Sequence, residues 1–181
     1  NGCPWDAGTC MWAAKGGHLE VLQWARANGW PWNRWTCAWA AKGGHLEALQ
    51  WAHTNGCPWH ERTCANAAHE RTCANAAQGG LLEVLQWARA NGCPWDAGTC
   101  HHAAEGGHLE VLQWARTKGY PWNIWTCARA AQNGHLEVLQ WAHANGCPWG
   151  RATLIAARKK GNLEVVNWCI ANGCPRSSGS S

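Results

Sequence analysis

Residues 13–29 read AAKGGHLEVLQWARANG and residues 130–146 read AAQNGHLEVLQWAHANG, so the same segment returns much later in the chain. A turn with the commonest form Asn-Gly-Cys-Pro-Trp accompanies each copy of this segment. The turns begin at Asn1, Asn28, Asn55, Asn91, Lys118 and Asn145, with a truncated copy at Asn172. Successive turns are 27 residues apart except for one step of 36. The chain is therefore a tandem repeat with a period of 27 residues.

Six repeats account for residues 1–171, which we treat as one domain. The repeats span residues 1–27, 28–54, 55–90, 91–117, 118–144 and 145–171. Residues 172–181 hold a partial repeat turn and end in Arg-Ser-Ser-Gly-Ser-Ser. This composition is typical of a flexible tail or of a residual expression tag.

The longer third repeat contains a duplication. The string HERTCANAA occupies residues 60–68 and again residues 69–77. In one continuous helix, nine residues add half a revolution to whole turns, so the two copies would face opposite sides. We expect one copy to pack in register and the other to be displaced as a loop or an extra turn. An error in the sequence itself is the alternative explanation.

Each repeat encodes two short helices. In the first repeat, the N-cap residue Asp6 predicts a helix over residues 7–15, which ends at a Gly pair. A second helix is expected over residues 19–27, with Glu20 in its first turn and an Asn-Gly pair after its end. No segment alternates polar and apolar residues, so we expect no strand. The counterparts of Asp6 are Asn33, Asp96 and Asn123.

Helices of about nine residues do not persist alone in water, so neighbouring repeats must stabilise one another. The first helix carries small residues such as Cys10 and Ala14, and the second carries a broad apolar face with Leu22 and Trp24. Twelve of the 17 Trp occupy the positions of Trp5 and Trp24 in successive repeats, which predicts that these framework side chains pack in the core. The predicted fold is all-α, an α-solenoid of stacked helix-turn-helix repeats.

The two segments quoted first resemble the ankyrin repeat, in which Ala-Ala-x-x-Gly-His-x-Glu-Val-Val leads into a Leu-rich helix and an Asn-Gly turn. The likeness recurs in all six repeats, with three departures. The period is 27 rather than roughly 33 residues. Thr-Cys-x-x, as in residues 36–39, replaces the family's Thr-Pro-Leu-His, and Trp replaces Leu on the second helix. The resemblance implies ankyrin-like repeats that lack the long β-hairpin finger, similar to the short, Trp-rich arrays of large DNA viruses and protists.

Composition argues against membrane and nucleic-acid partners. No apolar run approaches the roughly 18–20 residues that a membrane span needs. The net charge is +4 and only 14% of residues are charged, which does not suit a polybasic nucleic-acid-binding arm. Basic side chains near the ends of five second helices are explained by the helix dipole, and a parallel set of Glu residues offsets their charge. These basic residues are Arg26, His53, Arg89, Arg116 and His143.

The 12 Cys and ten His raise the question of zinc. The chain has no CxxC motif, Trp30 and Tyr120 replace the counterparts of Cys3, and Leu154 replaces the counterpart of Cys10. A thiolate ligand cannot be exchanged for Trp or Leu, whereas a buried thiol packs as a small hydrophobe. We therefore expect no metal and no cofactor. Reduced thiols suit an intracellular, cytoplasmic location, although an even number of Cys is also compatible with a secreted disulfide framework.

Catalysis is not expected. Cys100 is followed by His101 and His102, a possible nucleophile and base. A catalytic site also needs a group that orients the base and a pocket for the substrate, and a repeated helix pair supplies neither obviously. We predict that the protein is not an enzyme and has no small-molecule substrate.

The first helices carry a position that changes from repeat to repeat. The position just before the Ala pair holds Trp12, Trp39, Asn75, His102, Arg129 and Ala156. The core that the repeats share does not constrain such a position. The resemblance to the ankyrin repeat implies that this position lines the concave face that contacts partners. Exposed aromatic residues near Arg and His are typical of interface hot spots. The candidate partner-binding residues are Met11, Trp12, Lys15, Trp35, Trp39, Asn75, His101, His102, Trp125 and Arg129.

We predict a module that binds another protein through the variable face of its first helices. A permanent structural scaffold in a larger assembly and a zinc-dependent array are the alternatives, and the Trp side chains could simply cover a solvent-facing edge. The sixth repeat is atypical at Leu154, Lys159 and Cys169, whereas the first looks internal. We therefore expect the chain to be the C-terminal part of a longer protein. The resemblance would allow an upstream domain such as a ubiquitin-ligase adaptor motif.

Overall fold

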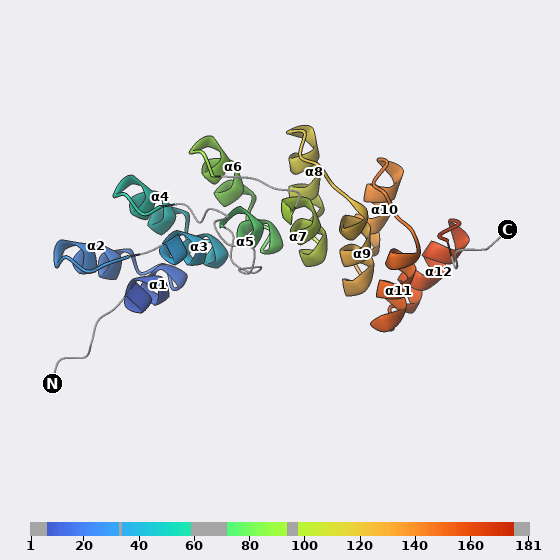
Figure 1. The fold of residues 1–181 in the computed structure, drawn as a ribbon, viewed down its shortest axis with the longest axis horizontal. Coiled ribbons are helices and arrows are strands. Elements are labelled where there is room, and N and C mark those ends of the chain that lie inside the picture. The colour runs from blue at the N-terminus through green and yellow to red at the C-terminus, as the bar shows by residue number, and fades with distance from the viewer. Residues whose placement is uncertain (1–6, 33, 59–71, 94–97, 176–181) are drawn as a thin grey trace. The chain divides into compact units, whose positions relative to one another are not determined.

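The structure, a computed structural model, describes residues 7–32, 34–58, 72–93 and 98–175 (Figure 1). Within these ranges the regular structure consists of helices alone, two for each repeat. The first helices are α1 (Ala7–Lys15), α3 (Arg34–Gly43), α5 (Thr72–Gln78), α7 (Gly98–Gly106), α9 (Ile124–Asn133) and α11 (Arg151–Lys159). The second helices are α2 (Leu19–Ala27), α4 (Leu46–Thr54), α6 (Leu82–Ala90), α8 (Leu109–Thr117), α10 (Leu136–Ala144) and α12 (Leu163–Ala171).

The chain divides into two compact halves. The N-terminal half comprises residues 1–76 and 81–94, and the C-terminal half comprises residues 77–80 and 95–181. In the N-terminal half, α1 lies beside α3 and α2 beside α4; in the C-terminal half, α9 lies between α7 and α11, and α8 lies beside α10 (Figure 1). First helices and second helices thus form separate layers within each half. The predicted α-solenoid of stacked helix-turn-helix repeats is confirmed.

Glycine residues end the helices where the sequence predicts. The helix α1 ends at Lys15 and α2 ends at Ala27, and the turns that follow contain Gly17 and Gly29 with φ of 71° and 75°. Gly17 is required for a second reason, because a Cβ atom there would lie 2.4 Å from Nδ1 of His45 in the next repeat. Backbone conformation and close packing therefore both select glycine at this turn.

The N-cap prediction is confirmed at Asn123. Its side-chain oxygen accepts a hydrogen bond of 2.9 Å from the backbone N–H of Trp125, and its own N–H donates to the Thr126 hydroxyl at 3.5 Å. This reciprocal capping box satisfies donors that the helix would otherwise leave open. The counterparts Asp6, Asn33 and Asp96 lie outside the described residues.

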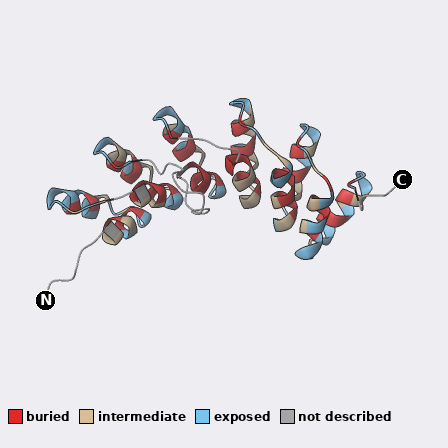
Figure 2. Ribbon diagram, viewed as in Figure 1, coloured by how far each residue is buried: buried red, intermediate tan, exposed pale blue. Residues whose placement is uncertain are grey.

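Leucine and alanine side chains fill the core between the two layers (Figure 2). The same Leu position of the second helix is completely buried in five repeats. These residues are Leu22, Leu49, Leu85, Leu112 and Leu139. The Ala pairs of the first helices face them, for example Ala103 and Ala104. Small residues on one helix and larger ones on the other therefore pack as the sequence predicts.

The prediction that the framework Trp side chains pack in the core needs correction. They flank the core instead: Trp24 is 51% exposed, and the other described members are half-buried. Pairs of them contact edge to face, with ring centroids 5.5 Å apart for Trp32 and Trp51 and 5.8 Å apart for Trp122 and Trp141. Trp is large and carries an indole N–H, so it is rarely buried completely. The framework members Trp5, Trp59 and Trp95 lie outside the described residues.

The second copy of the duplicated segment provides the first helix of the third repeat. The helix α5 begins at Thr72 and places Cys73, Ala76 and Ala77 in the buried layer. The first copy, residues 60–68, lies outside the described residues. The described helices are seven to ten residues long, and none has the length and apolar character needed to cross a membrane.

Candidate functional site

Two indoles and two ammonium groups gather on the first helices of the N-terminal half. Trp12 of α1 and Trp39 of α3 have ring centroids 6.1 Å apart with planes inclined by 33°. Nζ of Lys15 lies 4.8 Å from the centroid of each ring, and Nζ of Lys42 lies 4.6 Å from that of Trp39. Each Lys lies three positions after its Trp, so one helical turn brings ring and ammonium together. We call these four residues the indole–lysine cluster.

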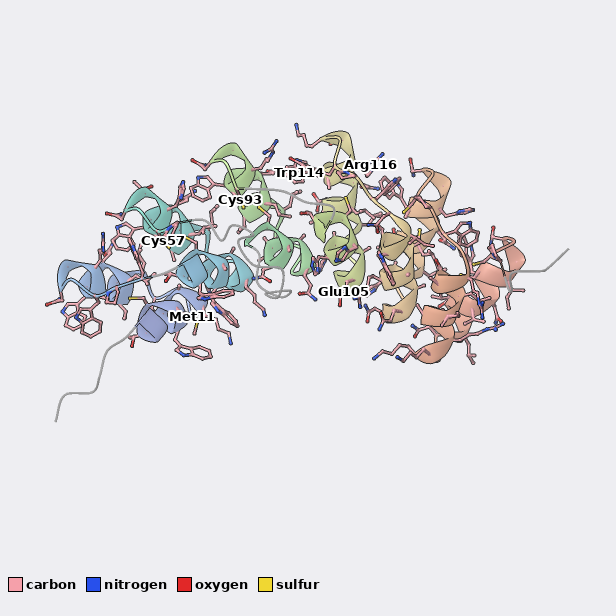
Figure 3. All side chains as sticks on the ribbon, in the orientation of Figure 1. Met11, Cys57, Cys93, Glu105, Trp114 and Arg116 are labelled. Atoms are coloured by element: carbon pink, nitrogen blue, oxygen red, sulfur yellow. The ribbon has the colours of Figure 1, made fainter. Side chains whose placement is uncertain are left out.

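The indole–lysine cluster is an accessible, positively charged surface. Trp12 is 58% exposed, and Trp39 is half-buried. Within the described part of the chain, Nε1 of Trp39 is buried without a hydrogen-bond partner. Neither α1 nor α3 contains an acidic residue, and the half-buried Met11 precedes Trp12 on α1 (Figure 3). The cluster therefore offers apolar rings and cations with no carboxylate on its own helices.

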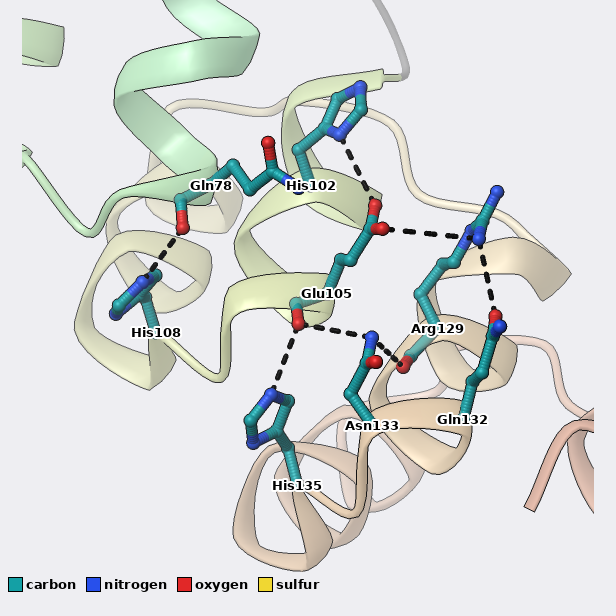
Figure 4. Close-up of polar contacts among 8 residues, drawn as sticks. All are labelled: Gln78, His102, Glu105, His108, Arg129, Gln132, Asn133 and His135. Atoms are coloured by element: carbon teal, nitrogen blue, oxygen red, sulfur yellow. Dashed lines mark hydrogen bonds and ion pairs between the residues drawn. The ribbon is translucent and has the colours of Figure 1, made fainter. Parts of the chain in front are cut away.

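The corresponding helices of the C-terminal half carry a polar network instead (Figure 4). Oε2 of Glu105 lies 3.5 Å from Nδ1 of His102, and Oε1 lies 3.9 Å from Nη1 of Arg129. Arg129 also donates to Oε1 of Gln132 at 3.2 Å, and the ring of His101 lies 4.3 Å from that of His102. The Glu105 carboxylate thus offsets the charge of Arg129. We call this group the Glu105 network.

Asn75 is not exposed on the variable face of the first helices, where the sequence predicts it. It is only 6% exposed, and its Nδ2 donates to the carbonyl oxygen of Ala38 at 3.5 Å. The amide is short enough to turn inward and link α5 to α3, which a larger side chain at this position does not do. Trp35 and Trp125 lie in the first turns of α3 and α9, where Trp35 is half-buried and Trp125 is exposed.

Sequence reasoning missed a set of hydrogen bonds that join neighbouring repeats. The ring Nε2 of His45 donates to the carbonyl oxygen of Lys15 at 3.0 Å. His108 and His135 make the same contact with Gln78 and Glu105, at 2.9 and 3.1 Å (Figure 4). These bonds satisfy carbonyl groups that the C-terminal turns of α1, α5 and α7 leave open. Each also fixes the helix end next to a candidate binding residue.

The sequence contains one indication of these hydrogen bonds, which is the replacement of His by Asn in the last repeat. Asn162 stands at the His135 position and donates through Nδ2 to the carbonyl oxygen of Gln132 at 2.8 Å. His and Asn both carry a side-chain N–H donor, so the exchange indicates that both repeats form a hydrogen bond at this position rather than packing alone. Leu81 occupies the position in the third repeat and has no such donor.

The basic residues at the ends of the second helices have a role beyond the helix dipole. The guanidinium of Arg26 lies 4.7 Å from the ring of Trp32, and that of Arg116 lies 4.1 Å from the ring of Trp122. The ring of His143 lies 4.0 Å from that of Trp149. Each cation or imidazole therefore covers the Trp of the following turn, in a cation–π arrangement for the two Arg. Among the described residues, no three His, Cys, Asp or Glu side chains come together as a possible metal site.

Comparisons with known proteins agree with this geometry. Residues 10–53 and 100–147 match the family described as ankyrin repeats (many copies). Among solved structures, the chain is similar to the crystal structure of the human ASB11 ankyrin repeat domain, with a TM-score of 0.70 and 19% sequence identity. That similarity covers 91% of this chain and 83% of the other. No curated protein matches the sequence.

Proposed function

Because this chain belongs to the ankyrin repeat family, whose members are generally protein–protein interaction modules, we propose that it binds another protein through its first helices. The indole–lysine cluster is the centre of the proposed surface. The observation that carries the proposal is the 58% exposure of Trp12 beside the second indole of Trp39. Buried Trp side chains dominate the energetics of many interfaces, so two adjacent accessible indoles favour binding.

The charge of the cluster favours an acidic partner. Lys15 and Lys42 lie against the indoles, and α1 and α3 supply no acidic residue to neutralise them. A partner segment with an aliphatic or aromatic side chain would cover the Trp rings, while its carboxylates would reach the two ammonium groups. Opposite charge would also speed the encounter of the two proteins.

The Glu105 network is the equivalent surface of the C-terminal half. His101, His102 and Arg129 present hydrogen-bonding groups there, and Glu105 holds two of them in place. We expect polar contacts that add selectivity more than affinity, because the charged groups already have partners. Asn75 is excluded from the proposed surface because it is buried.

The test is selection of binding peptides from a random displayed library on the whole chain. We expect enriched peptides to carry Asp or Glu next to an apolar residue. Fluorescence anisotropy then compares the native chain with the double variant Trp12→Ala/Trp39→Ala. The matched control is Trp24→Ala, since Trp24 is similarly exposed but lies on a second helix. Circular dichroism first confirms that all variants retain their helical content.

We expect the double variant to lose at least tenfold in affinity and Trp24→Ala to bind as the native chain does. Lys15→Glu is expected to weaken acidic peptides specifically. Equal binding by the native chain and the double variant would contradict the proposed surface. Enrichment of basic peptides would contradict the proposed charge of the partner.

A further inference from the structure

Three pairs of buried cysteines share one arrangement, in which a thiol on a first helix meets a thiol in the turn that opens the next repeat. The two members of a pair are 20 residues apart, and each is at most 3% exposed. The pairs are Cys37 with Cys57 and Cys73 with Cys93 in the N-terminal half, and Cys127 with Cys147 in the C-terminal half. All ten cysteines that the structure describes are thiols.

The two thiols of each pair interact through a side-chain hydrogen bond. The helix thiols of Cys37 and Cys127 hydrogen bond to the turn thiols of Cys57 and Cys147. The Cys37 thiol also lies 3.7 Å from the carbonyl oxygen of Cys57, so both the side chain and the backbone of the turn face it. Figure 3 marks Cys57 and Cys93 in the turns after α4 and α6.

In the pairs Cys37–Cys57 and Cys127–Cys147 the two members differ in the direction of their pKa shifts. The hydrogen bond from Cys37 lowers the pKa of Cys57 despite burial, and the backbone N–H of Cys37 and the nearby Arg26 add to this effect. The Cys127 thiol lowers the pKa of Cys147 in the same way. Burial opposes this effect, and the Cys127 N–H, the Thr126 hydroxyl and Arg116 add to it. The partner helix thiols have raised pKa values because they keep the shared proton. A lowered pKa favours the thiolate form, which is the nucleophile in thiol oxidation.

The chain contains an internal comparison for these pairs. Cys100 occupies the helix position in the fourth repeat, but Tyr120 stands at the turn position that a second cysteine would occupy. Burial raises the pKa of Cys100 to about 11, the opposite direction from Cys57 and Cys147. Cys57 and Cys147, which each have a cysteine at the helix position, therefore differ from Cys100, which has Tyr120 at the turn position.

We propose that the three cysteine pairs are oxidation sites at which a hydroperoxide forms disulfides between neighbouring repeats. The turn thiolate attacks an oxygen of hydrogen peroxide, the O–O bond breaks, and a sulfenic acid and hydroxide result. The helix thiol then attacks the sulfenic sulfur, its proton leaves with the hydroxyl group as water, and the S–S bond forms. In total the two thiols lose two electrons and two protons, and one peroxide becomes two water molecules.

Such a disulfide would tie each repeat to the next around a second helix. The Cys37–Cys57 bond would enclose α4, and the Cys127–Cys147 bond would enclose α10. Closing these loops would restrict the unfolded chain and raise the midpoint of thermal unfolding. This inference is independent of the proposed binding surface.

The experiment treats the reduced full chain with dilute hydrogen peroxide, blocks remaining thiols with N-ethylmaleimide and maps cross-linked peptides by mass spectrometry without reduction. We expect cross-links between the members of the three pairs, while Cys100 remains available to N-ethylmaleimide. In Cys57→Ser the cross-link at Cys37 should disappear and the other two should persist. Tyr120→Cys is the converse variant and should add a cross-link at Cys100.

The rate of alkylation gives a second measurement that needs no variant. At neutral pH, iodoacetamide should modify Cys57 and Cys147 at least tenfold faster than Cys100. Absence of cross-links in an oxidised chain that retains its helical circular dichroism would overturn the proposal. Cross-links that involve Cys100 of the native chain as often as the paired thiols would overturn it as well.

Discussion

Substitution of Leu139 should destabilise the C-terminal half more than substitution of the much larger Trp141. Leu139 is completely buried in α10, whereas Trp141 lies two residues further on the same helix and is half-buried. The order of the two effects depends on burial and not on side-chain size. The comparison therefore tests the conclusion that Leu fills the core and Trp flanks it.

The magnitudes follow from the area and volume that each change removes. Leu139→Ala deletes three buried carbons at about 0.8 kcal/mol each, and the cavity that remains brings the total loss to about 3–4 kcal/mol. A fully buried Trp would cost about 3–5 kcal/mol, but Trp141 retains solvent contact and loses chiefly its edge-to-face contact with Trp122, 5.8 Å away. We expect about 1.5–2.5 kcal/mol for Trp141→Ala.

Urea unfolding followed by circular dichroism at 222 nm measures both losses. The exposed neighbour Gln140 provides the control, because Gln140→Ala should change the free energy of unfolding by less than about 0.5 kcal/mol. The slope of each transition must stay constant for the comparison to hold, since repeats can unfold separately. A loss for Trp141→Ala equal to or greater than that for Leu139→Ala would refute the assignment of the core.

Two further predictions concern glycine and buried thiols. In urea unfolding, Gly107→Ala should lower the free energy of unfolding by about 2–3 kcal/mol and Gly119→Ala by about 1 kcal/mol. Both glycines have a positive φ near 80°. Only at Gly107 would an added Cβ meet the His135 ring, at 2.6 Å. Equal losses would contradict this contact. The contribution of the Cys100 thiol to the free energy of unfolding should fall above pH 9 and be lost by about pH 11. Burial raises the pKa of this thiol to about 11 in the folded chain, so the unfolded chain releases the proton at a lower pH. Cys100→Ala should reduce this decline between pH 9 and 11, and an unchanged pH profile would contradict it.

The helices and turns could be predicted because they depend on local chemistry that the repeat displays six times. Gly17 and Gly29 mark the ends of α1 and α2, and Asn123 begins α9 through its own side chain. No long-range information is needed for these features. The repeat also identified the variable position, and the structure brings Trp12 and Trp39 together there.

Features that depend on contact between repeats could not be predicted in the same way. The burial of Asn75 follows from its contact with α3, and the pairing of Cys37 with Cys57 follows from the register between a helix and the turn of the next repeat. A period gives the spacing of repeats along the chain but not this register. The half-burial of the Trp side chains likewise depends on the distance between layers, which Leu and Ala set.

The hydrogen bonds that His45, His108 and His135 donate each join a repeat to its immediate neighbour. When the chain is stretched by its ends, each of these contacts bears the same applied force. The repeats should therefore unfold one at a time. Release of a 27-residue repeat adds an extended length of about 90 Å. The third repeat has 36 residues and Leu81 in place of the histidine, so it should yield at a lower force and with a longer step of about 120 Å.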